Sequence, residues 1–422
     1  MNEQERLEKN NRIRQSMIET KLKRSLQRCL VYELKINTSK MNKKNLEKLK
    51  FLFVQCKWLY NYLLNEEIDI FKFDTKTRDI YIYDKDKNKI SKTIDIPSKI
   101  IQSVHGGLKQ NIQSLNHRKQ KGYKIGKLKF KSEYNSIDLS QYNNTHAIKN
   151  GKFRICGFKN LFKVHGLNQI KSDYEIANAK LIYKPSGYYI KLTCFENITN
   201  KRIQKPIKEV GLDFGIKTNI TTSDNEKFDI RIEESERLKG LQRKFARQIK
   251  GSNNRYKTLK KIKLEYEKLS NKKKDKCNKL VNYLCTNYST IYMQDEMIAG
   301  WHKGLFGKQV QHSCLGQLKS KLICQPIVKV IDKSYPTTKL CYNCGRLDKD
   351  ITLNDRTFIC PSCGFQEERD LKAAKTILFI GQCKNTYVPV ERRNTTVEKM
   401  SDSLSSYEQR KQSSMKQEAM KL

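Results

Sequence analysis

Apolar positions along the first half of the chain follow two periods, one helical and one typical of strands. Over residues 42–66 the apolar side chains recur every three or four positions, which predicts an amphipathic helix. Residues 98–118 repeat this spacing, and we expect the pair Gly106-Gly107 to interrupt that helix. Short alternating runs between 127 and 195, separated by Gly and Asn, predict strands instead. The first half is therefore expected to join helices to a β-rich module.

The second half of the chain alternates strand and helix patterns, as is typical of a mixed α/β region. Strands are predicted at 210–213, 218–222, 227–230, 290–294 and 327–331, and helices at 235–250, 256–287, 314–324 and 370–380. The first two helices flank a Gly-Ser-Asn-Asn turn and are expected to form a helical hairpin. Beyond residue 381 the chain is rich in Ser, Thr, Gln and Lys, which predicts a disordered tail.

The charge of the chain is extreme. It has 85 Lys and Arg residues against 44 Asp and Glu, a formal net charge of +41 over 422 residues. A lysine-rich coding bias explains part of this excess, because Asn and Ile are frequent as well. That bias would also raise Glu, so the imbalance favours a polyanionic partner. Nucleic acid is the expected partner, since its phosphates exchange condensed counterions for Lys and Arg.

The cysteines and the hydropathy indicate a compartment. Of thirteen cysteines, nine show no paired spacing, which is expected in a reducing cytoplasm and unusual in a secreted protein. The first 24 residues are charged throughout, unlike a signal peptide, and no apolar run approaches the ~20 residues of a membrane span. The length and the 37% apolar content allow two or three domains. We expect a soluble cytoplasmic protein with no membrane partner.

Four cysteines form two Cys-x-x-Cys pairs separated by fifteen residues. Two thiolate pairs at this spacing predict a tetrahedral zinc site, with Cys341, Cys344, Cys360 and Cys363 as ligands. Four protein ligands leave no open position on the metal, so the predicted role of the zinc is structural.

Three acidic residues stand at the ends of predicted elements in the α/β region. Asp213 ends an apolar strand, Glu296 follows the strand at 290–294, and Asp370 opens the last helix. Each residue alone is more typical of a turn, a surface charge or a helix cap. Their order and flanking elements together predict an RNase H-like nuclease core. Such a core holds two divalent magnesium ions through hard carboxylate oxygens.

Several motifs carry a resemblance to a known family. They are Gly-Leu-Asp-Phe-Gly-Ile-Lys at 211–217, the stretch at 294–301, Tyr-Pro-Thr-Thr-Lys-Leu-Cys-Tyr-Asn-Cys-Gly at 335–345, Phe-Ile-Cys-Pro-Ser-Cys-Gly at 358–364 and Arg-Asp-Leu-Lys-Ala-Ala-Lys at 369–375. From about residue 127 to 380 the chain resembles the TnpB family of transposon-encoded RNA-guided nucleases, which are related to miniature type V CRISPR effectors. Trp-Leu-Tyr-Asn at 58–61 fits the same family more loosely.

This resemblance implies a multi-domain α/β and β fold. It comprises a RuvC (RNase H-like) nuclease core with an inserted zinc ribbon, and a β-barrel wedge domain with a helical recognition insertion. The implied organisation is a basic helical extension at 1–28, a wedge domain at 29–42 and 119–205, a recognition insertion at 43–118, a nuclease domain at 206–337 and 367–381, a zinc ribbon at 338–366 and a disordered tail at 382–422.

Two positions depart from the family pattern. The middle motif often reads Glu-Asp-Leu, and here either Gln294-Asp295 or Glu296-Met297 can occupy that register. Side chains alternate along a strand, so Gln294 and Glu296 are expected on one face, with Glu296 as the metal ligand and Gln294 as a hydrogen-bond donor behind it. Lys372 stands where the family commonly has Asn, and we expect it to touch substrate.

The predicted nucleic-acid contacts are concentrated in one basic stretch. This stretch, residues 118–131, carries seven Lys and Arg residues and no acid. Its cations are interleaved with aromatic residues that suit stacking on bases. The predicted contact residues are Arg118, Lys119, Lys121, Tyr123, Lys124, Lys127, Lys129, Lys131 and Lys217.

The expected function is guide-RNA-directed cleavage of double-stranded DNA next to a short motif, at the nucleoid of a bacterial cell. Asp213, Glu296 and Asp370 would bind two Mg²⁺ ions in this activity. Two alternatives stay open, a nuclease-inactive RNA-guided repressor and an RNA-independent transposase. The sequence also leaves open whether the chain is a monomer or a homodimer.

Overall fold

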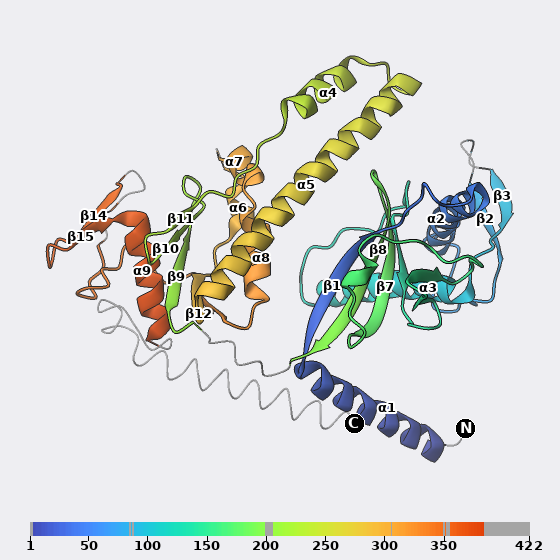
Figure 1. The fold of residues 1–422 in the computed structure, drawn as a ribbon, viewed down its shortest axis with the longest axis horizontal. Coiled ribbons are helices and arrows are strands. Elements are labelled where there is room, and N and C mark those ends of the chain that lie inside the picture. The colour runs from blue at the N-terminus through green and yellow to red at the C-terminus, as the bar shows by residue number, and fades with distance from the viewer. Residues whose placement is uncertain are drawn as a thin grey trace. The chain divides into compact units, whose positions relative to one another are not determined.

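The computed structural model describes residues 3–83, 86, 88–198, 206–304, 306–348, 351 and 355–383. The chain divides into two compact units, Met1–Lys201 and Arg202–Leu422 (Figure 1). Residues 384–422, which make up most of the predicted disordered tail, lie outside the described residues. No helix in the described ranges is both long enough and apolar enough to cross a membrane.

The first unit is built on an antiparallel sheet with strand order β1-β8-β7-β4. Its described elements are α1 (Glu3–Ser25), β1 (Gln27–Lys35), α2 (Lys43–Leu63), β2 (Asp79–Tyr83), β3 (Lys89–Thr93), α3 (Ser98–Gln120), β4 (Ser136–Leu139), β5 (His146–Lys149), β6 (Lys152–Ile155), the 3-10 turn η1 (Leu167–Gln169), β7 (Glu175–Lys184) and β8 (Gly187–Asn197). Alternate residues of β8, such as Ile190, Leu192 and Cys194, are fully buried, as the period-two pattern predicted. The predicted closure of this sheet into a barrel stays a prediction.

Helices α2 and α3 pack together with this sheet in a single core. The Asn42 side chain accepts a hydrogen bond from the Lys44 amide at 2.9 Å and caps α2 where the sequence predicted its start. The expected interruption of α3 at Gly106-Gly107 is wrong, because the helix runs through both glycines. Buried Val104 and Leu108 hold the helix on either side of them. The β2–β3 hairpin between the two helices was not predicted.

The second unit contains a mixed five-stranded sheet with order β11-β10-β9-β12-β13. Strands β9, β12 and β13 run parallel, whereas β10 and β11 are antiparallel to their neighbours. Its described elements are β9 (Glu209–Phe214), β10 (Ile220–Thr222), β11 (Lys227–Phe228), α4 (Glu236–Arg247), α5 (Asn253–Asn287), β12 (Thr290–Gln294), α6 (Ile298–Trp301), α7 (Gly307–His312), α8 (Leu315–Ile323), β13 (Val328–Ile331), β14 (Thr357–Ile359), β15 (Gln366–Glu368) and α9 (Arg369–Gln382). These elements confirm the predicted mixed α/β region, including the α4–α5 hairpin.

The sheet of the second unit is covered on both faces. Val210, Leu212 and Met293 are buried in a cluster with residues of α5 and α8. Tyr292 belongs instead to a cluster with Ile377 of α9. Because successive strand residues point to opposite faces, the α9 face also receives the odd-numbered residues of β9. Asp213 therefore lies on the same face of the sheet as α9.

Gly211 allows α9 to approach this face closely. A Cβ atom at position 211 would lie 2.1 Å from the carbonyl oxygen of Ala374 and 2.7 Å from the Leu378 nitrogen. Both are backbone atoms of the helix, so a side chain here would push α9 away from β9. The glycine two residues before Asp213 thus fixes how near the helix bearing Asp370 comes to that strand.

Candidate active site

The fold brings the three predicted carboxylates to one region of the second unit. Asp213 is the penultimate residue of β9, and Glu296 lies two residues beyond the end of β12. These strands are adjacent and parallel, so their carboxyl ends lie at the same edge of the sheet. Asp370 stands in the first turn of α9, which packs against β9. The three acids converge although up to 157 residues separate them in sequence.

The charges of Glu296 and Asp370 act on Asp213. The pKa of Asp213 is raised to about 8. Burial is the largest cause of this rise, and the negative charges of Asp370 and Glu296 add to it. The positive charges of Arg369 and Lys372 oppose this rise. Burial also raises the pKa of Glu296. A site in which negative charges crowd a half-buried carboxylate is suited to a cation.

The predicted arrangement of Gln294 is wrong. Strand β12 ends at Gln294, and the Glu296 amide turns back to donate to the Gln294 carbonyl at 2.9 Å. The alternation of side chains therefore does not continue to Glu296. The buried Gln294 amide instead donates to the Tyr335 carbonyl at 2.7 Å and accepts from the Thr337 hydroxyl at 2.9 Å. Gln294 anchors the loop before the first cysteine pair rather than supporting Glu296.

Lys319 of α8 holds the turn that carries Glu296. Its ammonium donates to the Asp295 carboxylate at 2.6 Å and to the Glu296 carbonyl at 2.7 Å. The Lys319 side chain is only 16% exposed, whereas that of Asp295 is 57% exposed. Asp295 is thus exposed and paired with Lys319, and Glu296 is the acid of this turn whose charge raises the pKa of Asp213. Sequence reasoning missed Lys319, because a lysine on an amphipathic helix carries no signal of its partner.

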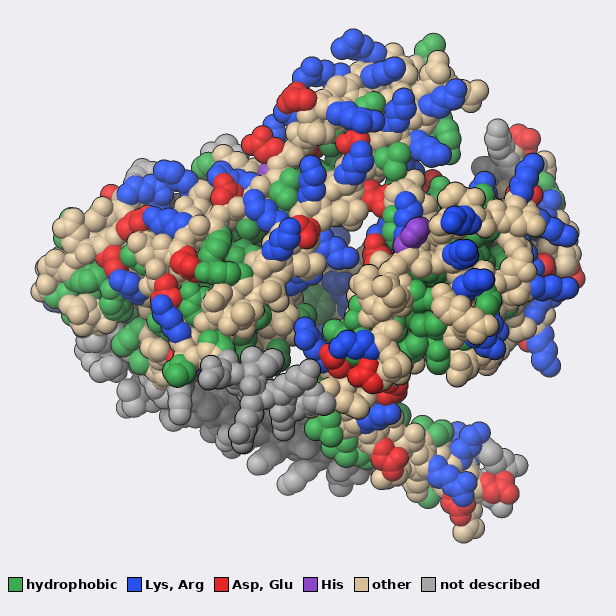
Figure 2. All heavy atoms as spheres, in the orientation of Figure 1, with side chains coloured by type: hydrophobic (Ala, Val, Ile, Leu, Met, Phe, Trp, Pro, Cys, Tyr) green, Lys and Arg blue, Asp and Glu red, His purple; other side chains and the backbone are tan. Residues whose placement is uncertain are grey.

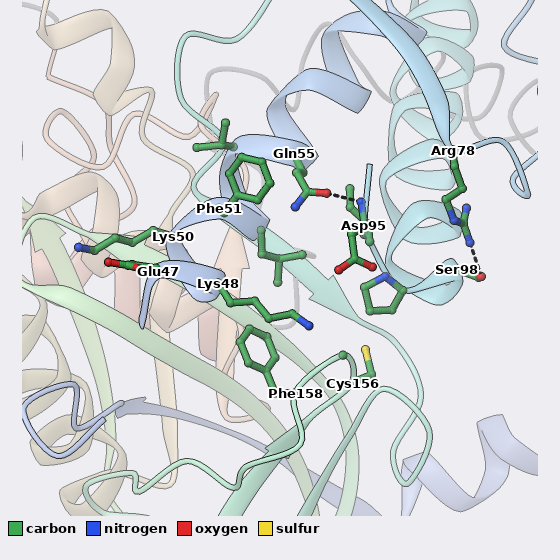
Figure 3. A pocket seen from close by; sticks show the side chains of 15 residues that line it. Glu47, Lys48, Lys50, Phe51, Gln55, Arg78, Asp95, Ser98, Cys156 and Phe158 are labelled. Carbon is green, nitrogen blue, oxygen red and sulfur yellow. Dashed lines mark hydrogen bonds between the residues drawn. The ribbon is translucent and has the colours of Figure 1, made fainter. Parts of the chain in front are cut away.

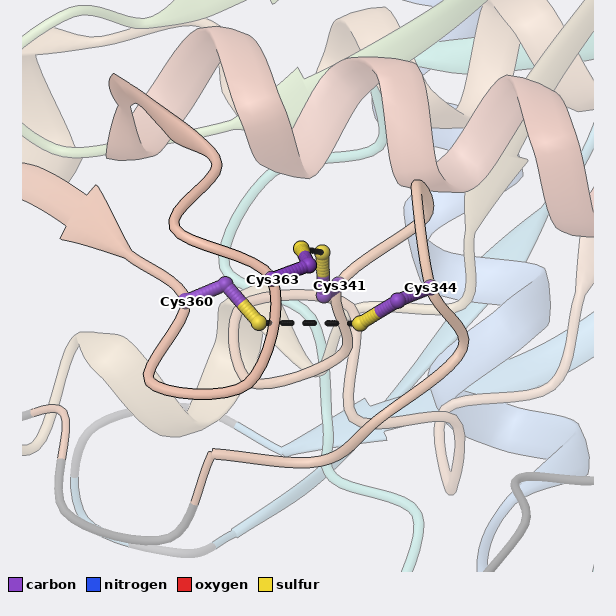
Figure 4. Close-up of side chains that lie close together, drawn as sticks. All are labelled: Cys341, Cys344, Cys360 and Cys363. Atoms are coloured by element: carbon purple, nitrogen blue, oxygen red, sulfur yellow. Dashed lines mark hydrogen bonds between the residues drawn. The ribbon is translucent and has the colours of Figure 1, made fainter.

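The four cysteines converge as predicted (Figure 4). Among the described residues they are the one group of three or more His, Cys, Asp or Glu side chains whose ligand atoms all lie within 4.8 Å of one another. The Sγ atoms of Cys341 and Cys363 are 3.8 Å apart, and those of Cys344 and Cys360 are 3.6 Å apart. A tetrahedron with Zn–S bonds of about 2.3 Å has edges of about 3.8 Å. The cluster can therefore bind zinc.

Each cysteine pair is formed by the same backbone turn. Gly345 donates to the Cys341 carbonyl at 2.8 Å, and Gly364 donates to the Cys360 carbonyl at 2.9 Å. Both glycines have positive φ, 75° and 70°, a conformation that side chains rarely adopt. The Phe365 amide donates to the Cys363 sulfur and contributes most to lowering the pKa of this thiol to about 6. This hydrogen bond favours the thiolate form of Cys363 that zinc requires, whereas burial raises the pKa of Cys341 and Cys344.

The prediction that Lys372 touches substrate is wrong. Its side chain is fully buried, and its ammonium donates to the carbonyls of Thr337 at 3.2 Å and Thr338 at 2.8 Å. The same ammonium lies 3.9 Å from the ring centroid of Phe358, in the zinc ribbon. Burial lowers the pKa of Lys372 to about 8. The buried Lys372 side chain therefore connects α9 to the residues just before the first cysteine pair and to the strand just before the second pair.

The predicted nucleic-acid contacts have different environments. Most of the stretch from 121 to 131 is irregular and exposed, and Tyr123 is 60% exposed, with the Arg118 guanidinium 5.9 Å from its ring centroid. Lys131 is an exception, because its ammonium lies 4.0 Å from the ring centroid of Tyr60 and 4.4 Å from that of Tyr134. Burial lowers the pKa of Lys131. Its ammonium is thus engaged by protein.

The remaining members of that predicted set are exposed. Lys119, Lys121, Lys124, Lys127, Lys129 and, in the second unit, Lys217 all present their side chains to solvent. Basic residues are also frequent on the α4–α5 hairpin, where Figure 2 shows Lys and Arg side chains along the helices (top).

Two family models match separate parts of the chain. Residues 193–300 match the family described as "Probable transposase", and residues 317–377 match the family described as "Cas12f1-like, TNB domain". Asp213 and Glu296 fall within the first match. Asp370 and the four cysteines fall within the second. The predicted catalytic acids are thus divided between the two matched regions.

Two curated proteins are similar to about half of the chain. One, from Streptomyces pristinaespiralis and provisionally named an RNA-guided DNA endonuclease, is 29% identical over 203 residues, which cover 46% of this chain and 50% of that protein. The other, InsQ of Escherichia coli K12, has the same provisional name and is 26% identical over 230 residues. These residues cover 49% of this chain and 57% of that protein. The chain thus matches about half the length of these relatives. Together with the two family matches, they support the resemblance of the chain to the TnpB family.

Proposed function

We propose that this protein is an RNA-guided endonuclease that cleaves double-stranded DNA. The observation that carries the proposal is the convergence of Asp213, Glu296 and Asp370 at one edge of a sheet, beside a four-cysteine cluster. The names of the two relatives support the same function. We further propose that residues 206–337 and 367–381 form a RuvC-type nuclease domain into which the zinc ribbon at 338–366 is inserted.

The three carboxylates would hold magnesium in this domain. Hard carboxylate oxygens are the ligands that Mg²⁺ prefers. The pKa of Asp213 is raised first by burial and then by the charges of Asp370 and Glu296, and a bound cation would offset both effects. When bound, two such ions would supply Lewis acidity at the scissile phosphate and a nucleophilic water at neutral pH. The close packing of β9 against α9 positions Asp213 and Asp370. The hydrogen bond from Lys319 to the Glu296 carbonyl positions the turn that carries Glu296.

The first unit and the exposed basic residues would bind the nucleic acids. We propose a wedge domain at 29–42 and 119–205 and a recognition insertion at 43–118. The guide RNA would pair with one DNA strand, while the protein reads the shape of the heteroduplex and a short adjacent motif. The exposed cations at 118–129 would neutralise phosphates, and Tyr123 would stack on a base.

Copurified RNA gives the simplest test of guided action. The purified protein is expected to carry RNA derived from sequence near its own gene, and ribonuclease treatment should abolish specific DNA binding. Adding back RNA with a changed guide segment should redirect binding to the matching DNA. A preparation that cuts DNA with no RNA present would instead support the transposase alternative.

The pKa of Asp213 predicts how the stability of the magnesium-free protein depends on pH. Because this pKa rises from 3.8 to about 8 on folding, the folded state binds more protons than the unfolded state between these values. Stability should therefore fall as the pH rises from about 4 to about 8. Asp213→Asn, which stays neutral, should remove this loss and be more stable than the wild type above about pH 8, by on the order of a few kcal/mol.

Thermal unfolding in magnesium-free buffer measures this difference. No chelator is used, because a chelator would also remove zinc. If the stability of the wild type and that of Asp213→Asn changed with pH in parallel, Asp213 would not be the group that causes the loss of stability.

Lys319 is expected to act as a positioning residue for Glu296. Lys319→Met removes both hydrogen bonds to the turn, so Glu296 should be less well oriented for metal binding. We expect the magnesium concentration for half-maximal cleavage to rise about tenfold, with DNA affinity unchanged and partial recovery in Lys319→Arg. Lys321→Met is the matched control, because Lys321 lies on the same helix and donates to Asn278 instead. An unchanged magnesium requirement in Lys319→Met would contradict this role.

A further inference from the structure

A cavity lies within the first unit, lined by residues between 47 and 158. It has a volume of about 950 Å³, within the range of small-ligand sites. It is bounded by α2, the segment before α3 and the loop after β6, and Figure 3 shows the side chains around it. The segments come from both the proposed recognition insertion and the proposed wedge domain. Ligand sites occur preferentially at such domain boundaries.

Two aromatic rings form the apolar walls of this cavity. Phe51 of α2 is 46% exposed despite its apolar ring, and Phe158 comes from the loop after β6. Phe51 is supported by Trp58, whose ring centroid lies 5.5 Å away in an edge-to-face arrangement. Exposed, supported rings of this kind are suited to stacking on a planar ligand.

Gln55 presents an amide donor to this cavity. Gln55 is only 4% exposed, and its Oε1 accepts a hydrogen bond from the Asp95 amide at 2.6 Å. Only the oxygen of a carboxamide can accept, so this contact fixes which way the group points. The Gln55 Nε2 has no recorded partner among the described residues. This N–H is therefore available to a ligand that enters the cavity.

Two carboxylates, those of Glu47 and Asp95, and three cations complete the cavity. Figure 3 shows the Asp95 carboxylate and the Lys48 ammonium extending into the same space. In the described part of the chain neither group forms an ion pair, and the Lys48 ammonium lies 5.6 Å from the ring centroid of Phe158. Lys50 lies at the rim, and Arg78 is held in place by Ser98, to which it donates at 2.8 Å. The cavity therefore offers acceptors and a donor inside, with cations around them.

We propose that this cavity binds one unpaired guanine nucleotide of RNA. A flat base would fit against Phe51 and Phe158, as unstacked RNA bases do on aromatic side chains. Among the four bases, guanine presents two adjacent N–H donors on its Watson–Crick edge, which match the two oxygens of Asp95. Its O6 acceptor would take the Gln55 N–H. Lys48 and Lys50 would meet the flanking phosphates.

This inference rests on the proposed function only in taking RNA as the source of the base. It requires neither cleavage nor the carboxylate site. A base held here would fix an unpaired position of the bound RNA relative to the first unit.

The test uses the full-length protein stripped of RNA and a short labelled oligouridine with a single central guanosine. Matched probes carry adenosine, cytidine or inosine at that position, and fluorescence anisotropy measures Kd at near-physiological salt. The wild type should bind the guanosine probe about tenfold more tightly than the adenosine and cytidine probes. Inosine, which lacks the N2 amino group, should lose part of this advantage.

Two variants locate the binding in the cavity. Asp95→Asn should bring the ratio between the guanosine and adenosine probes close to one, whereas Asp173→Asn, which changes an exposed acid outside the cavity, should keep it. Phe51→Ala should weaken binding of the guanosine probe, and Phe71→Ala, at a similarly exposed phenylalanine outside the cavity, should not. Circular dichroism confirms that each variant is folded.

Several results would overturn the inference. They are RNA binding by the wild type without preference for guanosine, retention of that preference in Asp95→Asn, and a change in oligomeric state rather than RNA affinity in Phe51→Ala, which would assign the cavity to a protein contact. A wild type that binds none of the RNA probes would also count against the proposed function itself. The two failures are therefore distinguishable.

Discussion

Glu296→Gln is expected to lower the rate of guided DNA cleavage at least about a thousandfold while leaving DNA binding intact. Glutamine keeps the size of the side chain but removes the negative charge that a divalent ion requires. Glu296 is the acid of its turn that raises the pKa of Asp213, so we expect it to share a metal with that residue. The measurement is single-turnover cleavage of a linear duplex that matches the guide, with binding followed in parallel.

Asp295→Asn is the matched control for this prediction. Asp295 is the neighbouring acid, but its carboxylate is exposed and paired with Lys319. We expect less than a tenfold effect, since asparagine can still accept a hydrogen bond from the lysine. If Asp295→Asn abolished cleavage and Glu296→Gln did not, the active-site register would be the other one that the sequence allowed.

Cys360→Ser is expected to remove zinc and unfold the ribbon at 338–366. Structural zinc sites contribute folding free energy directly, and Cys360 is 98% buried beside the fully buried Phe358. Loss of the ribbon would also free Lys372, whose ammonium lies against Phe358 and the Thr337–Thr338 carbonyls. Since Lys372 and Asp370 share the first turns of α9, we expect cleavage to fall at least about a hundredfold. Zinc content, limited proteolysis and cleavage are the three measurements.

Cys324→Ser provides the control, because Cys324 is an exposed cysteine of the same unit and lies outside the cluster. It should retain both zinc and activity. Full zinc content in Cys360→Ser would show that the cluster is not the metal site. Loss of zinc with unchanged cleavage would show that the ribbon does not support α9.

The sequence predicted most of the secondary structure because local periodicity determines it. The strand at 290–294 has the predicted bounds, and Ser235 caps α4 through its bond to the Leu238 amide. The short helices α6 and α7 were missed, since four to six residues are too few to show a helical period. The β2–β3 hairpin was missed because it lies between two strong helical patterns.

The sequence predicted those parts of the site that depend on residue type and on order along the chain. The zinc cluster follows directly from cysteine spacing, and the convergence of Asp213 with Asp370 follows from parallel strands and a packed helix. The environments of Gln294, Lys131 and Lys372 depended on contacts made by distant segments. Gln294 bonds to residues about forty positions away, and Lys372 to a carbonyl and a ring on two other segments. No local pattern contains such partners.

Cleavage of a guide-matched duplex by the wild-type ribonucleoprotein tests the central claim most directly. With Mg²⁺, the account predicts cutting of a matched DNA target, no cutting of a mismatched one, and loss of both strand breaks in Glu296→Gln. Binding of the matched target without any cleavage in Mg²⁺, or cleavage that persists after the RNA is removed, would contradict it.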